Sequence, residues 1–157
     1  MLASTQSRRF HNLWWRIPLL LAISGVLFMA FWDGLTKNWA FISTTAKDPG
    51  LRALELPCSP RDAVPRATSV LAGLPRWMIV TVNGPEGKLH AVHRTWFWRF
   101  DDDVHLQFEP LGEGRCLMTG ESRSRVGKGD LGQNARNLKE ARAAIAAAFP
   151  ETARAKP

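Results

Sequence analysis

The sequence predicts an α+β fold in which an N-terminal transmembrane helix is followed by a two-layer domain, a four-stranded antiparallel meander packed against two helices. Three observations predict this fold. An uncharged run extends from Ile17 to Trp32. Four strand-like stretches follow one another with short connections, and a stretch of helical periodicity lies on either side of them. The 157 residues, 45% of them hydrophobic, suit one modest domain with an anchor.

The apolar run is the centre of a predicted transmembrane signal anchor at residues 13–35, which follows a polar N-terminal tail at residues 1–12. Tryptophans bracket the run in the way typical of a membrane interface, at Trp14, Trp15, Trp32 and Trp39. The alternatives are a cleaved signal peptide and a buried helix of a soluble protein. The bulky residues at 29–33 do not form the small-residue site that cleavage requires, which favours a retained anchor.

The orientation of the anchor follows from the basic residues that flank it. Three arginines precede the run within the N-terminal 16 residues, and Lys37 and Lys47 follow it. This slight excess predicts a cytoplasmic N-terminus and a periplasmic domain. In that oxidising space Cys58 and Cys116 could pair as a disulfide, and the alternative is that they are two unrelated small hydrophobic residues.

Residues 36–61 are predicted to be an extended connector, because they are rich in proline and show little periodicity. Trp39, Phe41 and Ile42 are the large apolar residues near its start. We consider three places for them: the lipid headgroup layer, the surface of another membrane subunit, or the core of the following domain.

The α+β domain is predicted at residues 62–149, with a C-terminal tail at residues 150–157. A helix over residues 63–74 carries one apolar stripe and ends at a proline. Strands follow at residues 77–82, 89–100, 104–108 and 115–124, and the first two are joined by an Asn-Gly-Pro-Glu-Gly turn. A second helix over residues 131–149 has its apolar residues on one side and can lie across the sheet.

Residues 122–134, SRSRVGKGDLGQN, join the last strand to the last helix. Gly127 and Gly129 permit a sharp turn on either side of a lysine. Asp130 and Gln133 have the spacing at which both side chains reach back to free N–H groups of a helix start. With Asn134, these residues form a predicted structural turn and cap.

The same segment offers a candidate binding site for an anion or an acidic partner. Arg123, Arg125 and Lys128 stand beside a predicted helix start, where backbone N–H groups also attract negative charge. We favour a structural alternative, in which Asp130 caps the helix and Arg125 pairs across the sheet with an aspartate of residues 101–103.

Residues 122–134 also resemble the Arg-Ser-x-Ser-Arg-x-Gly-x-x-Asp-x-Gly-x-Asn signature of the bacterial domain-of-unknown-function 1499 family. Residues 98–104, WRFDDDV, are similar to that family's turn of phenylalanine followed by paired aspartates. The resemblance covers roughly residues 62–148, and of the family's Asn-Cys-Val-Ser-Ser segment only Cys58-Ser59-Pro60 is present. It implies a fold and brings no established chemistry with it.

Large aromatic residues occupy both faces of the predicted second strand, with Trp96, Trp98 and Phe100 alternating with Phe97. If helices cover the sheet on one side only, one of these faces is exposed and forms a patch for a partner or a lipid-like ligand. The alternative is that the connector covers the patch.

No catalytic group is predicted. His90 and His93 are an odd number of positions apart on a strand, so they point to opposite faces and do not share a metal. His105 could approach Glu109, but a third ligand at a suitable spacing is absent from the sequence. The aspartates at 101–103 are expected to form a solvated turn. We therefore predict no enzyme activity, cofactor or metal.

The net charge of +7 and a pI near 10.3 suit an anionic partner, but the basic residues are spread along the chain, which argues against dedicated nucleic-acid binding. The sequence therefore predicts a non-catalytic accessory or assembly subunit of a larger integral-membrane complex, photosynthetic or respiratory, in the bacterial inner membrane. Its expected partners are membrane lipids and other integral-membrane subunits. The alternative is a membrane-tethered periplasmic domain that binds a small anionic or lipid-like ligand.

Overall fold

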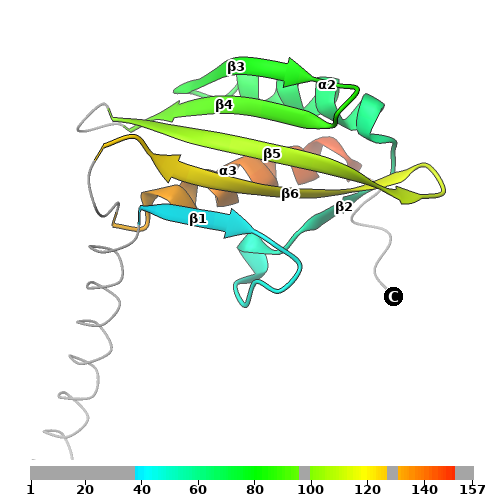
Figure 1. The fold of residues 1–157 in the computed structure, drawn as a ribbon, viewed down its shortest axis with the longest axis horizontal. Coiled ribbons are helices and arrows are strands. Elements are labelled where there is room, and N and C mark those ends of the chain that lie inside the picture. Colours follow the sequence, from blue (N-terminus) through cyan, green and yellow to red (C-terminus); the bar gives the residue numbers. More distant parts are fainter. Residues whose placement is uncertain (1–37, 96–99, 127–130, 151–157) are drawn as a thin grey trace, which may run out of the picture.

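The computed structural model of the chain describes residues 38–95, 100–126 and 131–150. These residues form one antiparallel sheet of six strands, and two helices lie on the same side of it (Figure 1). The predicted α+β fold is thereby confirmed. The predicted anchor at residues 13–35, with Trp14, Trp15 and Trp32, lies outside the described residues, and within them no helix is long and apolar enough to cross a membrane.

The predicted four-stranded meander is present. It consists of β3 (Trp77–Asn83), β4 (Lys88–Arg94), β5 (Asp101–Gly112) and β6 (Arg115–Ser124), each antiparallel to the next. The Asn-Gly-Pro-Glu-Gly turn joins β3 to β4 as expected, and the Asn83 carboxamide oxygen accepts a hydrogen bond from the Glu86 N–H at 3.2 Å. Side chains therefore alternate between the two faces of the sheet along each strand.

The expected extended connector at residues 36–61 instead contributes to the sheet. It forms β1 (Trp39–Ile42), the short 3-10 helix η1 (Pro49–Leu51) and β2 (Leu54–Leu56), and both strands pair with β6. The sheet order is β1-β6-β5-β4-β3, with β2 also beside β6. The physical reason is burial, because these two strands cover the exposed edge of β6 and place three apolar side chains in the core, those of Ile42, Leu54 and Leu56.

The aspartates at 101–103 also differ from expectation, because they begin β5 instead of forming a solvated turn, and β4 ends at Arg94. Alternation along β5 buries Asp102, whose carboxylate accepts a hydrogen bond at 2.8 Å from the Asn137 amide. Asp101 and Asp103 point to the other face and form ion pairs with arginines. Each of the three carboxylates thus has a partner that compensates its removal from water. Trp96 and Trp98 lie outside the described residues.

The two helices are α2 (Pro60–Ala72) and α3 (Gln133–Ala148). The first begins three residues earlier than predicted, because Pro60 stands in the first turn, where its missing N–H leaves no bond unmade. The second begins at Gln133, after Gly132 in a left-handed conformation with φ of 77°. Gln133 does not reach back to cap it, since its amide donates to Asn137 at 2.7 Å. Gly127, Gly129 and Asp130 lie outside the described residues.

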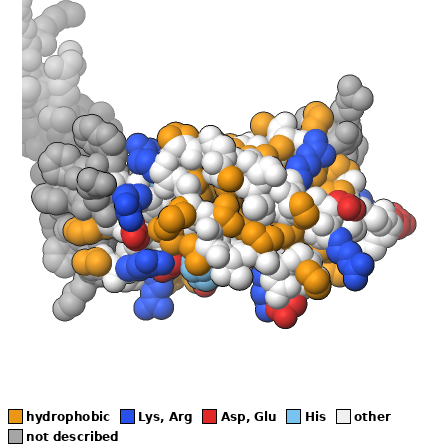
Figure 2. Space-filling view, turned by 90° about the horizontal axis from the view of Figure 1, so that it is seen from above, with side chains coloured by type: hydrophobic (Ala, Val, Ile, Leu, Met, Phe, Trp, Pro, Cys, Tyr) orange, Lys and Arg blue, Asp and Glu red, His pale blue; other side chains and the backbone are white. Residues whose placement is uncertain are grey.

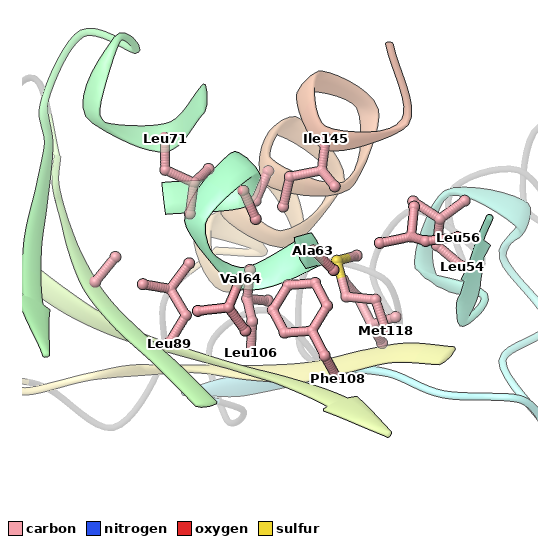
Figure 3. Close-up of a cluster of buried hydrophobic side chains, with 14 of the residues drawn as sticks. Leu54, Leu56, Ala63, Val64, Leu71, Leu89, Leu106, Phe108, Met118 and Ile145 are labelled. Carbon is pink, nitrogen blue, oxygen red and sulfur yellow. The ribbon is translucent and has the colours of Figure 1, made fainter. Parts of the chain in front are cut away.

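The hydrophobic core fills the space between the two helices and the sheet (Figure 3). Its labelled members come from both helices and from strands β2, β4, β5 and β6: Leu54, Leu56, Ala63, Val64, Leu71, Leu89, Leu106, Phe108, Met118 and Ile145. The opposite face of the sheet, which we call the open face, is not covered by either helix (Figure 1). Among the described elements, therefore, neither helix occupies this face of the sheet.

Candidate binding face

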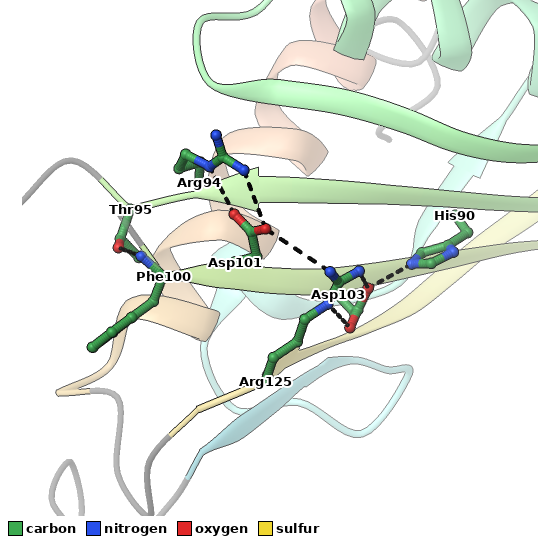
Figure 4. Close-up of polar contacts among 7 residues, drawn as sticks. All are labelled: His90, Arg94, Thr95, Phe100, Asp101, Asp103 and Arg125. Carbon is green, nitrogen blue, oxygen red and sulfur yellow. Dashed lines mark hydrogen bonds and ion pairs between the residues drawn. The ribbon is translucent and has the colours of Figure 1, made fainter. Parts of the chain in front are cut away.

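A network of ion pairs occupies the open face where β4, β5 and β6 run side by side (Figure 4). The Arg125 guanidinium donates to both oxygens of the Asp103 carboxylate, at 2.7 and 2.8 Å. His90 Nε2 lies 2.7 Å from Asp103 Oδ1, and Arg94 donates to Asp101 at 2.8 Å. The predicted pairing of Arg125 with an aspartate of residues 101–103 is confirmed.

The network fixes the ionisation of its two carboxylates. The Arg125 hydrogen bonds lower the pKa of Asp103 to about 2, against the opposing effect of burial and with a further hydrogen bond from His90. The hydrogen bond from Arg94 lowers the pKa of Asp101. Asp103 therefore carries no proton to donate near neutral pH, which disfavours it as a general acid.

A hollow of about 640 Å³ lies beside this network, in the middle of the open face. His90, His105 and Glu121 form one row across β4, β5 and β6, and the two imidazole rings are stacked with centroids 4.1 Å apart. The surface of the hollow is mostly apolar although many of its residues are polar, and it is lined by Phe41, Ile42, Ser43, Thr81, Asn83, Lys88, Leu89, His90, His105, Leu106, Gln107, Thr119, Gly120 and Glu121. Its volume lies within the range of sites that bind small molecules or anchor side chains.

An aromatic pair on β1 extends this surface. Trp39 and Phe41 point to the open face, their ring centroids are 5.0 Å apart, and the side chains are 49% and 46% exposed. Trp39 lies opposite Arg123 on β6. Exposed aromatic side chains of this kind are enriched where proteins bind partners.

The predicted basic site is only partly assembled. Arg125 is engaged by Asp103 and Asp101, so its charge is compensated within the chain. Arg123 is exposed on the open face and forms no ion pair with the rest of the described chain. Lys128 lies outside the described residues. Within the described residues, Arg123 alone is left of the predicted anion site.

The signature segment has a structural role that the sequence only partly indicated. Asn134 is buried at the start of α3, where it accepts a hydrogen bond from Ser122 Oγ at 2.6 Å and donates to Asn38 O at 2.9 Å and Ser124 Oγ at 3.0 Å. It therefore fastens α3 to β6 and to the chain just before β1. We expected Asn134 to belong to a helix cap, and it is instead the hub of this junction.

A second buried polar group was not anticipated. His93 points into the core side of the sheet, as predicted from its odd spacing to His90, and it is 2% exposed with neither ring nitrogen hydrogen-bonded. Its ring packs edge-on against Trp77, and Glu140 Oε2 is 3.7 Å from its Nε2. Burial lowers the pKa of His93, although Glu140 opposes this shift. In the sequence, the only indication of this contact between His93, Trp77 and Glu140 was that α3 carries polar residues on the side that faces the sheet.

The two cysteines are neighbours but remain thiols. The pairing of Cys58 with Cys116 considered from the sequence is not formed in the structure. Burial, together with the smaller effects of charge and a side-chain hydrogen bond from the nearby Cys58, raises the pKa of Cys116 to about 12. The proximity of the two residues follows from β2, which pairs with the part of β6 that contains Cys116 and leads directly into the segment before α2.

Metal ligands do not converge in the described part of the chain, where no three histidine, cysteine or acidic side chains are arranged to hold an ion. The stacked rings of His90 and His105 are only 18° from parallel. Their nitrogen lone pairs lie in the ring planes, so they run side by side and do not meet at one point. His105, which the sequence suggested could approach Glu109, is stacked on His90.

A family model described as "Protein of unknown function (DUF1499)" matches residues 34–145, and thus begins before the residue 62 expected from the resemblance. No curated protein matches the chain significantly. Similar solved structures include the di-domain ARO/CYC BexL from the BE-7585A biosynthetic pathway, with 9% identity over 75% of this chain and a TM-score of 0.47. This chain spans 47% of the length of that protein.

Two further solved structures have a similar arrangement of elements. Norcoclaurine synthase from Thalictrum flavum, in complex with dopamine and hydroxybenzaldehyde, has 12% identity, a TM-score of 0.46 and coverage of 80% of this chain and 92% of its own. A Thermobifida fusca protein solved by NMR has 11% identity, a TM-score of 0.40 and coverage of 74% and 90%. At these identities the likeness concerns the fold alone.

Proposed function

Because the chain belongs to the DUF1499 family of proteins of unknown function, we propose its function from geometry: it is a non-catalytic accessory or assembly subunit of a larger integral-membrane complex. In this proposal residues 13–35 form a retained single-pass anchor, the N-terminus is cytoplasmic and the domain is periplasmic at the bacterial inner membrane. A photosynthetic or respiratory complex is the kind of host we propose.

The observation that carries the proposal is the open face, with its hollow beside exposed Trp39 and Phe41. We propose that this face receives a segment of a neighbouring membrane subunit. An apolar side chain of that segment would enter the hollow beside Phe41, and polar groups would meet His105 and Glu121 on its floor. β1 follows the proposed anchor after only a few residues, which keeps this face near the membrane where such a subunit lies.

The electrostatics of the face suit recognition better than acid–base catalysis. Asp103 and Asp101 are held ionised by arginines, and Lys88 pairs with Glu86 at 2.7 Å. Such paired charges can fix the register of a partner and reject groups of the wrong sign.

The test is gentle detergent extraction followed by native gel electrophoresis and mass spectrometry of the complexes. We expect the full chain to migrate with integral-membrane partners and Phe41→Ser to release it. Met78→Ser is the matched control, because Met78 is also exposed and apolar but lies on β3, outside the hollow. A wild-type chain that migrates alone would contradict the proposal, as would a complex that tolerates Phe41→Ser and His105→Trp together.

The volume of the hollow supports a second candidate, a tethered binding domain for a small anionic or lipid-like ligand. Arg123 is the cation it would use, because Arg125 and Lys88 are each already paired with a carboxylate. Native mass spectrometry of the purified full chain separates the two candidates. A small molecule that copurifies with the wild type and is lost from His105→Trp, which would fill the hollow, favours the ligand-binding domain.

A further inference from the structure

Exposed apolar side chains gather at one end of the sheet. We call this the proximal end: β1 and β5 begin there, β4 and β6 end there, and α3 starts beside it (Figure 1). Trp39, Phe100, Val126 and Leu131 are 49%, 42%, 54% and 57% exposed, and they come from different parts of the chain. Exposed hydrophobic side chains that gather from separate segments indicate a contact surface.

Backbone contacts hold these residues at the same end. Arg125 N donates to Asp101 O at 3.2 Å. Val126 follows Arg125 and Phe100 precedes Asp101, so this bond holds the two segments that contain them side by side. Ser124 N donates to Asn38 O at 3.1 Å, so the start of β1 lies beside the end of β6. These pairings make the proximal end a fixed part of the fold.

The two ends of the sheet also differ in charge. At the proximal end the arginines at 76, 94, 123, 125 and 136 outnumber the partly exposed aspartates at 101 and 103 among the described residues, and these aspartates pair with Arg94 and Arg125. At the opposite end, around the β5–β6 hairpin, the charged residues are mostly acidic: Glu55, Glu109, Glu113 and Arg115. Apolar side chains bordered by arginines suit the interface of a bilayer with anionic headgroups.

The position of the proposed anchor also indicates that the proximal end is the end of the sheet nearer the membrane. Trp39 is four positions after Leu35, the last residue of the predicted segment, so the two lie at most about 14 Å apart whatever path the chain takes. The headgroup region beyond the hydrocarbon core is roughly 5–8 Å thick on each side. Trp39 therefore stands within reach of the headgroups if Leu35 is at the edge of the core.

We propose that the proximal end rests in the headgroup layer of the bilayer, with Trp39, Phe100, Val126 and Leu131 inserted. Anionic lipid phosphates would be bound by the arginines that form no ion pair within the described residues, Arg76, Arg123 and Arg136. This inference rests on the proposed membrane tether. The open face then stands beside the membrane, turned toward neighbouring subunits, while the β5–β6 hairpin points away from the lipid.

The test uses the full chain in vesicles of phosphatidylethanolamine and phosphatidylglycerol. Val126→Cys is labelled with a nitrobenzoxadiazole dye in a Cys58→Ser background, and the buried Cys116 is left in place. Leu111→Cys is the matched control, because Leu111 is an apolar residue, 43% exposed, at the opposite end of the sheet. We expect doxyl-labelled lipids to quench the dye at position 126 at least about twofold more strongly than at position 111.

The outcomes distinguish a failure of this inference from a failure of the membrane tether on which it rests. A chain that does not float with the vesicles overturns the tether and this inference together. A chain that floats but shows equal quenching at positions 126 and 111 overturns the inference and leaves the tether standing. A dye at position 126 that is blue-shifted but unquenched is covered by protein, such as a second copy of the chain, and also overturns it.

Discussion

Arg125 and Asp103 form a two-point ion pair across β6 and β5, with both carboxylate oxygens accepting from the guanidinium at 2.7 and 2.8 Å. The same carboxylate is 2.7 Å from His90 Nε2, so a single aspartate joins three strands of the open face. This relationship connects the signature segment to the hollow. It also makes the geometry of His90 dependent on Arg125.

Asp103→Asn should lower the stability of the domain in a pH-dependent way. The pKa of Asp103 is about 2 in the folded chain and near 4 when unfolded, so its contribution is present above about pH 4 and is lost as the pH falls toward 2. For a partly exposed pair we expect a loss of about 1 kcal/mol at pH 7, which disappears below pH 2. Urea unfolding across this range measures it. Glu109→Gln, on the same strand but without an ion pair in the described chain, should show no such loss.

His93→Leu should make the domain less sensitive to mild acid. Burial lowers the pKa of His93 below the unfolded value near 6.5. Between these two values the unfolded chain binds an extra proton, so the domain becomes less stable as the pH falls. Glu140, Arg76 and Asp102 are the charged groups that act on this ring. We expect the variant to gain roughly 0.5–1 kcal/mol relative to wild type between pH 7.5 and 5.5. An unchanged slope in His93→Leu would show that folding does not lower the pKa of His93.

Much of the domain could be predicted from sequence because its strands follow one another with short turns. The meander from β3 to β6 and both helices follow from periodicity, and the ion pair of Arg125 follows from the proximity of neighbouring strands. These features depend on contacts between adjacent elements. Local patterns are sufficient to indicate them.

The features that sequence missed depend on pairing between distant segments. The strands β1 and β2 are short, separated by η1, and become strands only because β6 offers its edge. The His90–His105–Glu121 row depends on the registers of β4, β5 and β6 together. Periodicity shows which residues share a face, but not which of them lie opposite each other across strands.

Asn134→Ala should destabilise the domain strongly, because it removes the three hydrogen bonds that link Asn134 to Ser122, Asn38 and Ser124 within the described residues. Ser122 Oγ and Asn38 O would lose a partner within the described chain that solvent does not replace easily. We expect a loss of roughly 2–4 kcal/mol in the free energy of unfolding. Gln133→Ala, one position earlier on the same helix, should cost under about 1 kcal/mol. Equal losses in the two variants would show that Asn134 acts only through helix propensity.

Cys116 should resist alkylation in the folded chain although it is a thiol. Its pKa is raised to about 12 by burial and by Cys58, so the thiolate that reacts with iodoacetamide is scarce at pH 8. We expect the native chain to react at Cys116 more than about a hundredfold more slowly than the urea-unfolded chain, as followed by mass spectrometry of the peptide. Cys58→Ser tests the cause: since burial is the larger effect, Cys116 should stay protected in that variant. Rapid labelling of Cys116 in folded Cys58→Ser would show instead that the neighbouring thiol, and not burial, suppresses its reactivity.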